Sequence, residues 1–276
     1  MHQGPLPADS GPYVLATGEA AAYRLRILHR LYGPGTRRLL LDAGARPGLR
    51  AADVGYGVGM VTGLLAEFVG PEGQVVGIDV SAEQLAQAKK RLSTGRDNVR
   101  FVQASATDTG LPRGSFDLVY CRFLLMHLPD PEAALREMSA LLRPGGTLVC
   151  EDGDLRTAGS QPTSALAAGA DLFRRLGPAR GVDYTLGGRL FHMVQAAGFP
   201  APEVSFNQPV AARGEDKRLL ELSVAEAGPA IVAAGLLTPG ELDRALAEMR
   251  RANADESVLA VMPRMTGVWA RKPGGR

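Results

Sequence analysis

Between residues 50 and 152, short apolar runs alternate with segments in which apolar residues return at helical spacing. The apolar runs predict strands at 50–54, 74–79, 99–104, 116–121 and 146–152. Each run is apolar nearly throughout, which is typical of parallel strands that are covered on both faces. The alternation therefore predicts a doubly wound α/β sheet with right-handed crossover connections.

Capping residues mark helix boundaries between these runs. Ser81 and Gln84 form a capping-box pair at the start of one helical segment. Asp130-Pro131-Glu132 supplies an N-cap, a proline at the first helical position and an acid in the first turn of another. Helices are thus predicted after the first, second and fourth strands.

The N-terminal flank has a different pattern. Residues 17–32 predict an amphipathic helix whose apolar face packs on the protein and whose arginines Arg24, Arg26 and Arg30 point outward. A second short helix is expected at 36–44, immediately before the first strand. Residues 1–47 are therefore interpreted as an N-terminal segment with lid helices.

The regular alternation ends after residue 152. Helices are expected at 166–176, 188–197 and twice within 216–252, and strands at 203–210 and 264–271. Thr238 and Glu241 form the capping box of the last helix. Residues 48–152 are predicted to be the ligand-binding core, and 153–276 the rest of the core with cap insertions at about 153–185 and 216–252. We expect the cap to lie over the carboxyl edge of the sheet.

A glycine-rich loop follows the first predicted strand. Residues 53–59 read DVGYGVG, and Asp79 ends the next strand in VVGID. Glycines at this position allow a sharp turn and a close approach of the backbone to a ligand beside the switch point of the sheet. A carboxylate at the end of the neighbouring strand can accept both hydroxyl groups of a ribose. The pattern predicts a nucleoside-bearing cofactor.

Two classes of cofactor fit such a loop. A dinucleotide fingerprint requires G-x-G-x-x-G, but Met60 stands where its third glycine would be, which weakens the case for a pyrophosphate. Asp53, two residues before the first glycine, would help to hold an ammonium group. A cofactor with an amino-acid end and a ribose is therefore favoured, and S-adenosylmethionine has both.

The composition of the chain limits the classes of partner that it can bind. The 276 residues carry a formal charge of +2, and no basic run is interleaved with aromatic residues, so a nucleic-acid partner is not expected. The chain start lacks the pattern of a secretory signal, and no apolar run is long enough for a membrane span. We expect a cytoplasmic protein without a membrane partner, with Cys121 and Cys150 buried as small apolar residues. The sequence is compatible with a homo-oligomer.

Several stretches of the sequence together resemble a known family. The stretches ADVGYGVG, VVGIDVS, FVQASAT, SFDLVYCRFLLMHLPDP and LLRPGGTLVCED follow the order and spacing of class I S-adenosylmethionine-dependent methyltransferases. The similarity is greatest to the small-molecule branch that contains ubiquinone/menaquinone-type and natural-product enzymes. It covers residues 51–152. It implies a Rossmann-like sheet of seven strands with an antiparallel last strand.

The resemblance also implies roles for individual residues. Asp53, Gly55 and Gly57 would surround the methionine moiety, and Asp79 would bind the ribose hydroxyls. The adenine and the remaining cofactor contacts would fall to Val80, Gln84, Ser105, Ala106 and Arg122. Ser105 departs from the family pattern, which often has an aspartate there, and a neutral hydroxyl accepts the adenine amino group more weakly. Tyr56 either shapes the part of the site that holds the methionine moiety of the cofactor or only packs against its neighbours.

Candidates for the chemistry lie beyond the fourth and fifth strands and in the flanks. His127 is a candidate general base or a residue that holds its loop, and Arg122 could meet the cofactor carboxylate or an anionic substrate. Asp152 and Asp154 end the fifth strand and act in the acceptor pocket or as caps. An aromatic lid over the sulfonium could come from Tyr13, Tyr23 or Tyr184. No set of residues has metal-ligand spacing, so no metal is expected.

We therefore predict a methyltransferase that transfers the methyl group of S-adenosylmethionine to O, N or C of a small molecule, with a specialised metabolite preferred. Two alternatives stay open. The protein could be a non-methylating member that keeps the cofactor, such as a cyclase or a binding protein. It could also be an NAD(P)-dependent oxidoreductase, which Asp53 and Met60 disfavour.

Overall fold

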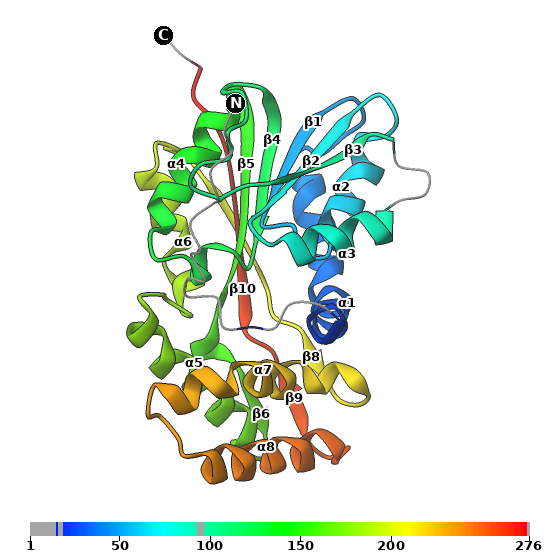
Figure 1. The fold of residues 1–276 in the computed structure, drawn as a ribbon. Coiled ribbons are helices and arrows are strands. Elements are labelled where there is room, and N and C mark those ends of the chain that lie inside the picture. Colours follow the sequence, from blue (N-terminus) through cyan, green and yellow to red (C-terminus); the bar gives the residue numbers. More distant parts are fainter. Residues whose placement is uncertain (1–14, 16–18, 93–96, 275–276) are drawn as a thin grey trace.

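The computed structural model describes residues 15, 19–92 and 97–274. Its main sheet has seven strands in the order β3-β2-β1-β4-β5-β10-β7 (Figure 1). These strands are β1 (Arg50–Val54), β2 (Gln74–Asp79), β3 (Val99–Gln103), β4 (Phe116–Arg122), β5 (Leu142–Asp154), β7 (Glu203–Asn207) and β10 (Arg264–Arg271). Strand β10 is antiparallel to both of its neighbours, whereas β1 to β5 are parallel. The predicted Rossmann-like sheet with an antiparallel last strand is confirmed.

Helices cover both faces of this sheet. Figure 1 shows α2 and α3 on one side and α4 and α6 on the other. The helices are α1 (Glu19–Asp42), α2 (Met60–Val69), α3 (Ala82–Leu92), α4 (Pro131–Leu141), α5 (Ala165–Arg180), α6 (Leu190–Ala196), α7 (Leu219–Ala233) and α8 (Pro239–Ala254). Successive residues of β4 alternate between two buried apolar clusters, Leu118 in one and Val119 in the other. Cys121 and Cys150 are fully buried and do not form a disulfide, as expected.

The N-terminal flank differs from its prediction. Instead of two helices, one helix α1 runs through Pro34. Side chains on both sides of the proline are anchored: the Tyr32 hydroxyl donates to the carbonyl of Pro263, and the Thr36 hydroxyl donates to Glu151. Because both halves are held by buried tertiary contacts, the hydrogen bond lost at Pro34 does not break the helix.

The cap is a second layer beyond the carboxyl edge of the main sheet. Helices α5, α7 and α8 pack there around a small sheet of β6 (Gly159–Gln161), β9 (Leu259–Val261) and β8 (Val210–Ala211) (Figure 1). This small sheet was not predicted from the sequence, and the single strand that was predicted at 203–210 is divided between β7 and β8. Pro209 separates the two parts, and its carbonyl accepts the backbone N–H of Met262.

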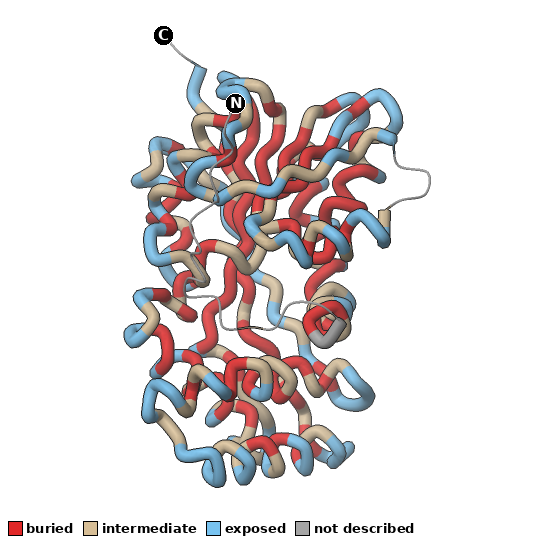
Figure 2. Tube along the Cα trace, viewed as in Figure 1, coloured by how far each residue is buried: buried red, intermediate tan, exposed pale blue. Residues whose placement is uncertain are grey.

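Buried segments connect the two layers (Figure 2). Strands β5 and β10 leave the main sheet and continue toward the cap, and β5 is buried through Asp154. The capping box of Thr238 and Glu241 at the start of α8 is present as predicted. No helix within the described residues has the length and apolar character needed to cross a membrane.

Candidate active site

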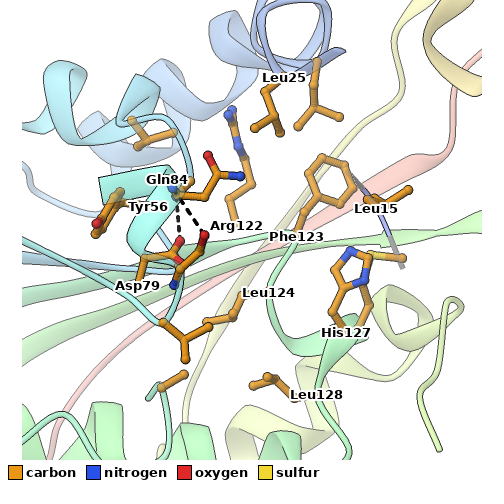
Figure 3. A pocket seen from close by; sticks show the side chains of 18 of the residues that line it. Leu15, Leu25, Tyr56, Asp79, Gln84, Arg122, Phe123, Leu124, His127 and Leu128 are labelled. Carbon is orange, nitrogen blue, oxygen red and sulfur yellow. Dashed lines mark hydrogen bonds between the residues drawn. The ribbon is translucent and has the colours of Figure 1, made fainter. Parts of the chain in front are cut away.

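A cavity of about 670 Å³ lies where the main sheet, α1 and the cap meet. The end of β1 and the end of β4 both reach it, and these two neighbouring strands form the switch point of the sheet. Ligands of open α/β sheets bind in this position. Figure 3 shows Asp79, Gln84 and Tyr56 gathered on one side of the cavity, and Phe123, His127 and Leu15 on the other.

The glycine loop closes onto Asp79. Gly55 and Gly57 have φ values of 76° and 55°, a region that side chains disfavour. The Gly57 N–H donates to Oδ2 of Asp79 at 2.9 Å. A Cβ at Gly55 would lie 2.9 Å from a methyl carbon of Leu124, so a larger residue would collide with the cavity wall. The loop therefore presents bare backbone to the cavity.

The side chain of Gln84 takes no part in the capping box, which forms only in part. The Ser81 hydroxyl accepts the Gln84 N–H at 3.2 Å, which is half of the box. The reciprocal donor, the Ser81 N–H, goes to Oδ1 of Asp79 at 3.0 Å. The Gln84 side chain is 4% exposed and lines the cavity, and its Oε1 has no hydrogen-bond partner within the described residues. A buried amide oxygen without a donor is costly, which indicates that a ligand supplies one.

Asp53 lines the same side of the cavity and is buried. Its Oδ2 accepts the Thr62 hydroxyl of α2 at 2.6 Å. Burial raises the pKa of Asp53 to about 6, although the hydrogen bond from Thr62 and the positive charge of Arg122 oppose the rise. A buried carboxylate with a raised pKa is suited to a cationic partner such as an ammonium group.

Arg122 is held by a buried polar network beneath the cavity. Its Nη1 donates to the Thr36 hydroxyl at 3.1 Å, and Thr36 in turn donates to Glu151 at 2.7 Å. The Tyr120 hydroxyl donates to the same carboxylate oxygen of Glu151 at 2.5 Å. Burial raises the pKa of Glu151, and Arg122 opposes that rise. The network fixes a guanidinium at the cavity wall and connects α1 with β4 and β5.

The predicted adenine-side residues line one end of the cavity: Val80, Ser105 and Ala106. Val80 is 63% exposed, which is unusual for an apolar residue at the end of a buried strand. The Ser105 hydroxyl lies 2.9 Å from the Thr107 hydroxyl and accepts the Thr107 N–H. Ser105 is therefore positioned by its own turn and lies open at the surface.

Tyr56 packs and also lines the cavity. Its ring lies 4.9 Å from that of Phe101, centroid to centroid, and against Gly77, where a Cβ would come within 2.9 Å of it. The hydroxyl is buried and has no hydrogen-bond partner within the described residues. Burial raises the pKa of the Tyr56 hydroxyl, so the group stays protonated and can donate a hydrogen bond. The two interpretations of Tyr56 are thus compatible.

The opposite side of the cavity is mostly apolar. Its walls come from α1, from the segment after β4 and from the cap, and include Leu25, Phe123, Leu155, Phe173, Leu220 and Met262. Phe123 has φ 50°, the sole positive φ among described non-glycine residues, and its ring meets Tyr32 edge-on at 5.2 Å. Strained backbone is retained where the surroundings require it, and here it directs an aromatic ring to the cavity. The sequence offered no signal for Phe123.

His127 and Tyr184 add polar groups to this apolar side. Their rings are 5.5 Å apart, and both line the cavity. Burial, assisted by the positive charge of Arg24, lowers the pKa of His127 to about 3. The imidazole is consequently neutral across the physiological pH range.

Arg24 is the main correction to the sequence analysis at this site. It was expected to point outward with Arg26 and Arg30, which are indeed exposed, but Arg24 is 3% exposed and lines the cavity. Its Nε donates to Glu226 of α7 at 2.8 Å. Helix α1 is covered by the cap as well as by the core, so its arginine face is only partly exposed.

Three predicted residues do not contribute to the cavity wall. Asp152 is fully buried and accepts the N–H groups of Met126 and Gly153, so it braces the turn that carries His127. Burial raises the pKa of Asp152 to about 7. Asp154 caps a 3-10 turn and pairs with Arg156. Tyr23 is absent from the cavity lining, and Tyr13 lies outside the described residues.

The polar side fits the cofactor that the sequence predicts. It combines a carboxylate for an ammonium group, a guanidinium for a carboxylate, a second carboxylate at the strand end and bare glycine backbone, from Asp53, Arg122, Asp79 and the loop. Two buried polar atoms there, Gln84 Oε1 and the Tyr56 hydroxyl, await partners. Within the described residues, no three His, Cys, Asp or Glu side chains are placed to hold a metal ion.

Comparison with known proteins supports this reading of the core. Residues 52–150 match the family model described as a methyltransferase domain. Over 127 residues the chain is 40% identical to demethylmenaquinone methyltransferase of Staphylococcus aureus, which is 46% of this chain and 50% of that protein. The chain thus spans about half the length of the curated relatives it matches.

Solved structures share the fold. The YcgJ protein of Bacillus subtilis aligns with a TM-score of 0.57 at 20% identity, over 86% of this chain and 97% of its own. The [4+2]-cyclase SpnF aligns with a TM-score of 0.53 at 21% identity, over 95% of this chain and 86% of its own. The domain match confirms the resemblance for this part of the chain: residues 52–150 form a class I S-adenosylmethionine-dependent methyltransferase domain.

Proposed function

We propose that this protein binds S-adenosylmethionine in the polar half of the cavity and transfers its methyl group to a small, largely apolar molecule held in the other half. The observation that carries the proposal is the division of one cavity into these two halves. Asp53, Asp79 and Arg122 line the polar half, and apolar side chains from α1 and the cap line the other. The cofactor supplies a methyl carbon that is activated by a positively charged sulfonium. The sulfonium leaves as the neutral thioether of S-adenosylhomocysteine.

The protein's own contribution is alignment and exclusion of water. Thr36 positions Arg122, and the Gly57 to Asp79 hydrogen bond positions the loop, so the protein's own hydrogen bonds orient the polar half. The cap closes the apolar half with Phe173, Leu220 and Met262. Holding two reactants in line and away from water provides much of the acceleration in such displacements.

His127 serves as a neutral hydrogen-bond acceptor in the apolar half. With a pKa of about 3, its imidazole does not take up a second proton at neutral pH. It is therefore suited to orient a hydroxyl or amino group of the acceptor rather than to store its proton. Asp152 acts through His127, because it accepts the Met126 N–H in the same turn.

Label transfer tests the proposal. The protein is incubated with methyl-labelled S-adenosylmethionine and a panel of aromatic and polyprenyl acceptors, and organic-extractable label is counted. We expect transfer to at least one apolar acceptor of the panel. Tight binding of the cofactor without transfer to any panel member would favour a cyclase or a binding protein, and binding of NADH in its place would favour an oxidoreductase.

The fold is also compatible with a non-methylating role. SpnF, a [4+2]-cyclase, shares this fold over most of the chain. At 21% identity that likeness concerns the fold alone. The alternative is separated from methyl transfer by the same experiment.

A further inference from the structure

Arg24 is a buried arginine whose surroundings do not use all of its donors. It is 3% exposed, and its Nε donates to Glu226 at 2.8 Å. Its Nη2 has no hydrogen-bond partner within the described residues. Leaving a buried guanidinium N–H without an acceptor is expensive. The cavity that Arg24 lines is where such an acceptor can come from.

The position of Arg24 is in the apolar half. Its charge acts on His127, where it is one of the two causes of the lowered pKa. Leu25 and Leu28 follow it on α1, and Leu220 and Ser223 of α7 line the cavity from the other side. Within the described residues, the apolar half thus contains the donor-only side chain of Arg24 and the neutral imidazole of His127, and both line the same cavity.

We infer that Arg24 and His127 form a recognition site for a phenol-type hydroxyl on an otherwise apolar, aromatic acceptor. The hydroxyl oxygen accepts an N–H of Arg24, and the hydroxyl hydrogen is donated to the neutral imidazole of His127. The inference rests on the proposed function, because it places the acceptor in the apolar half.

The charges of Arg24 and Glu226 favour a neutral hydroxyl over a charged group on the acceptor. Glu226 already neutralises Arg24, so a carboxylate would bring an uncompensated negative charge into an apolar chamber, which is unfavourable. An ammonium group would likewise bring an uncompensated positive charge into the chamber, beside the guanidinium of Arg24. A hydroxyl offers an oxygen to Arg24 and a hydrogen to His127, and it adds no net charge.

Binding of simple probes tests the inference without requiring turnover. The affinities of 2-naphthol, 2-methylnaphthalene and 2-naphthoate are measured by calorimetry, with and without S-adenosylhomocysteine. We expect the wild type to bind 2-naphthol about 10-fold more tightly than 2-methylnaphthalene, the scale of a hydrogen bond to a charged group. Arg24→Met, which retains the apolar stem, should lose this preference.

Arg30→Met is the matched control. Arg30 lies on the same helix but is exposed, and it pairs with Asp216 at 2.8 Å. This variant should keep the preference for 2-naphthol. Glu226→Gln provides an independent variant should Arg24→Met fail to fold: it removes the neutralising charge, and the affinity for 2-naphthoate should rise about 10-fold relative to 2-naphthol.

Three results would overturn the inference. They are equal affinities of the wild type for 2-naphthol and 2-methylnaphthalene, an unchanged preference in Arg24→Met, and no response of 2-naphthoate binding to Glu226→Gln. Titration of S-adenosylhomocysteine on the same samples keeps the two claims apart. If that cofactor product binds while the hydroxyl preference is absent, the acceptor site is refuted and the proposed function is not.

Discussion

The two halves of the cavity are built in different ways. Most of the polar half comes from a short stretch of the core, in which the loop after β1 is held by Asp79 at the end of β2. Arg122 is the exception, because it comes from β4 and is held by Thr36 of α1. The apolar half is assembled from α1, the turn after β4 and the cap, which are far apart in the sequence. One half is largely a local construction and the other depends on the packing of distant elements.

This difference shows where variation can enter. The proposed cofactor side relies on backbone groups of the glycine loop and on the charges of Asp53, Asp79 and Arg122. The acceptor side relies on side chains such as Arg24 and Phe123, and Arg24 is held by a cap residue, Glu226. A change of acceptor therefore requires changes only in α1, the turn after β4 and the cap, with the polar half left intact.

The largest expected effect separates the halves through catalysis. His127→Gln should lower the rate of methyl transfer to a phenol-type acceptor about 100-fold, because the hydroxyl loses its orienting partner. Affinity for S-adenosylhomocysteine should stay within about 3-fold, since His127 lies in the apolar half. The rate is measured by label transfer. His192→Gln, at an exposed position on α6, is the control, and an equal loss in that variant would contradict the assignment.

A pH titration sharpens the comparison. Asp53, whose pKa is raised to about 6, must be ionised to hold an ammonium group. Affinity for S-adenosylhomocysteine should therefore be constant above pH 7 and fall by up to about 10-fold per pH unit below pH 6. Calorimetry at several pH values measures this. Asp53→Asn should abolish the acid slope, whereas His127→Gln should leave it in place because the pKa of that imidazole is about 3.

The smallest effect concerns the stability of the cap. Thr238 accepts the Glu241 N–H in the capping box of α8, which lies away from the cavity. Thr238→Ala should lower the free energy of unfolding by about 1 kcal/mol in chemical denaturation. Thr238→Ser should restore most of that loss. Neither variant should change cofactor affinity, and a change would mean that the halves are coupled through the cap.

The residues of the polar half between β1 and α3 could be placed together from the sequence, because that part of the half is encoded locally. Strand periodicity and the glycine spacing placed Asp53, the loop and Asp79 at one edge of the sheet, and the structure brings them together. Gln84 lines the same cavity next to them. These residues lie within 32 positions of one another, so only the order of two neighbouring strands had to be correct.

The apolar half was not predicted, and the reasons are physical. Helical periodicity assigned Arg24 to solvent because it assumes that a helix has one buried side, whereas α1 packs against both the core and the cap. The small sheet of β6, β8 and β9 was missed because strands of two or three residues show no periodicity. The strained backbone of Phe123 depends on tertiary packing that no local pattern records.

Binding of S-adenosylhomocysteine to two variants tests the division of the cavity most directly. Asp79→Ala removes the carboxylate that fixes the loop and is proposed to hold the ribose, and it should weaken binding at least about 10-fold. Arg24→Met should bind S-adenosylhomocysteine with the same affinity as the wild type. If Asp79→Ala binds with unchanged affinity, or if Arg24→Met loses as much affinity as Asp79→Ala, the account of a cofactor half and an acceptor half is wrong.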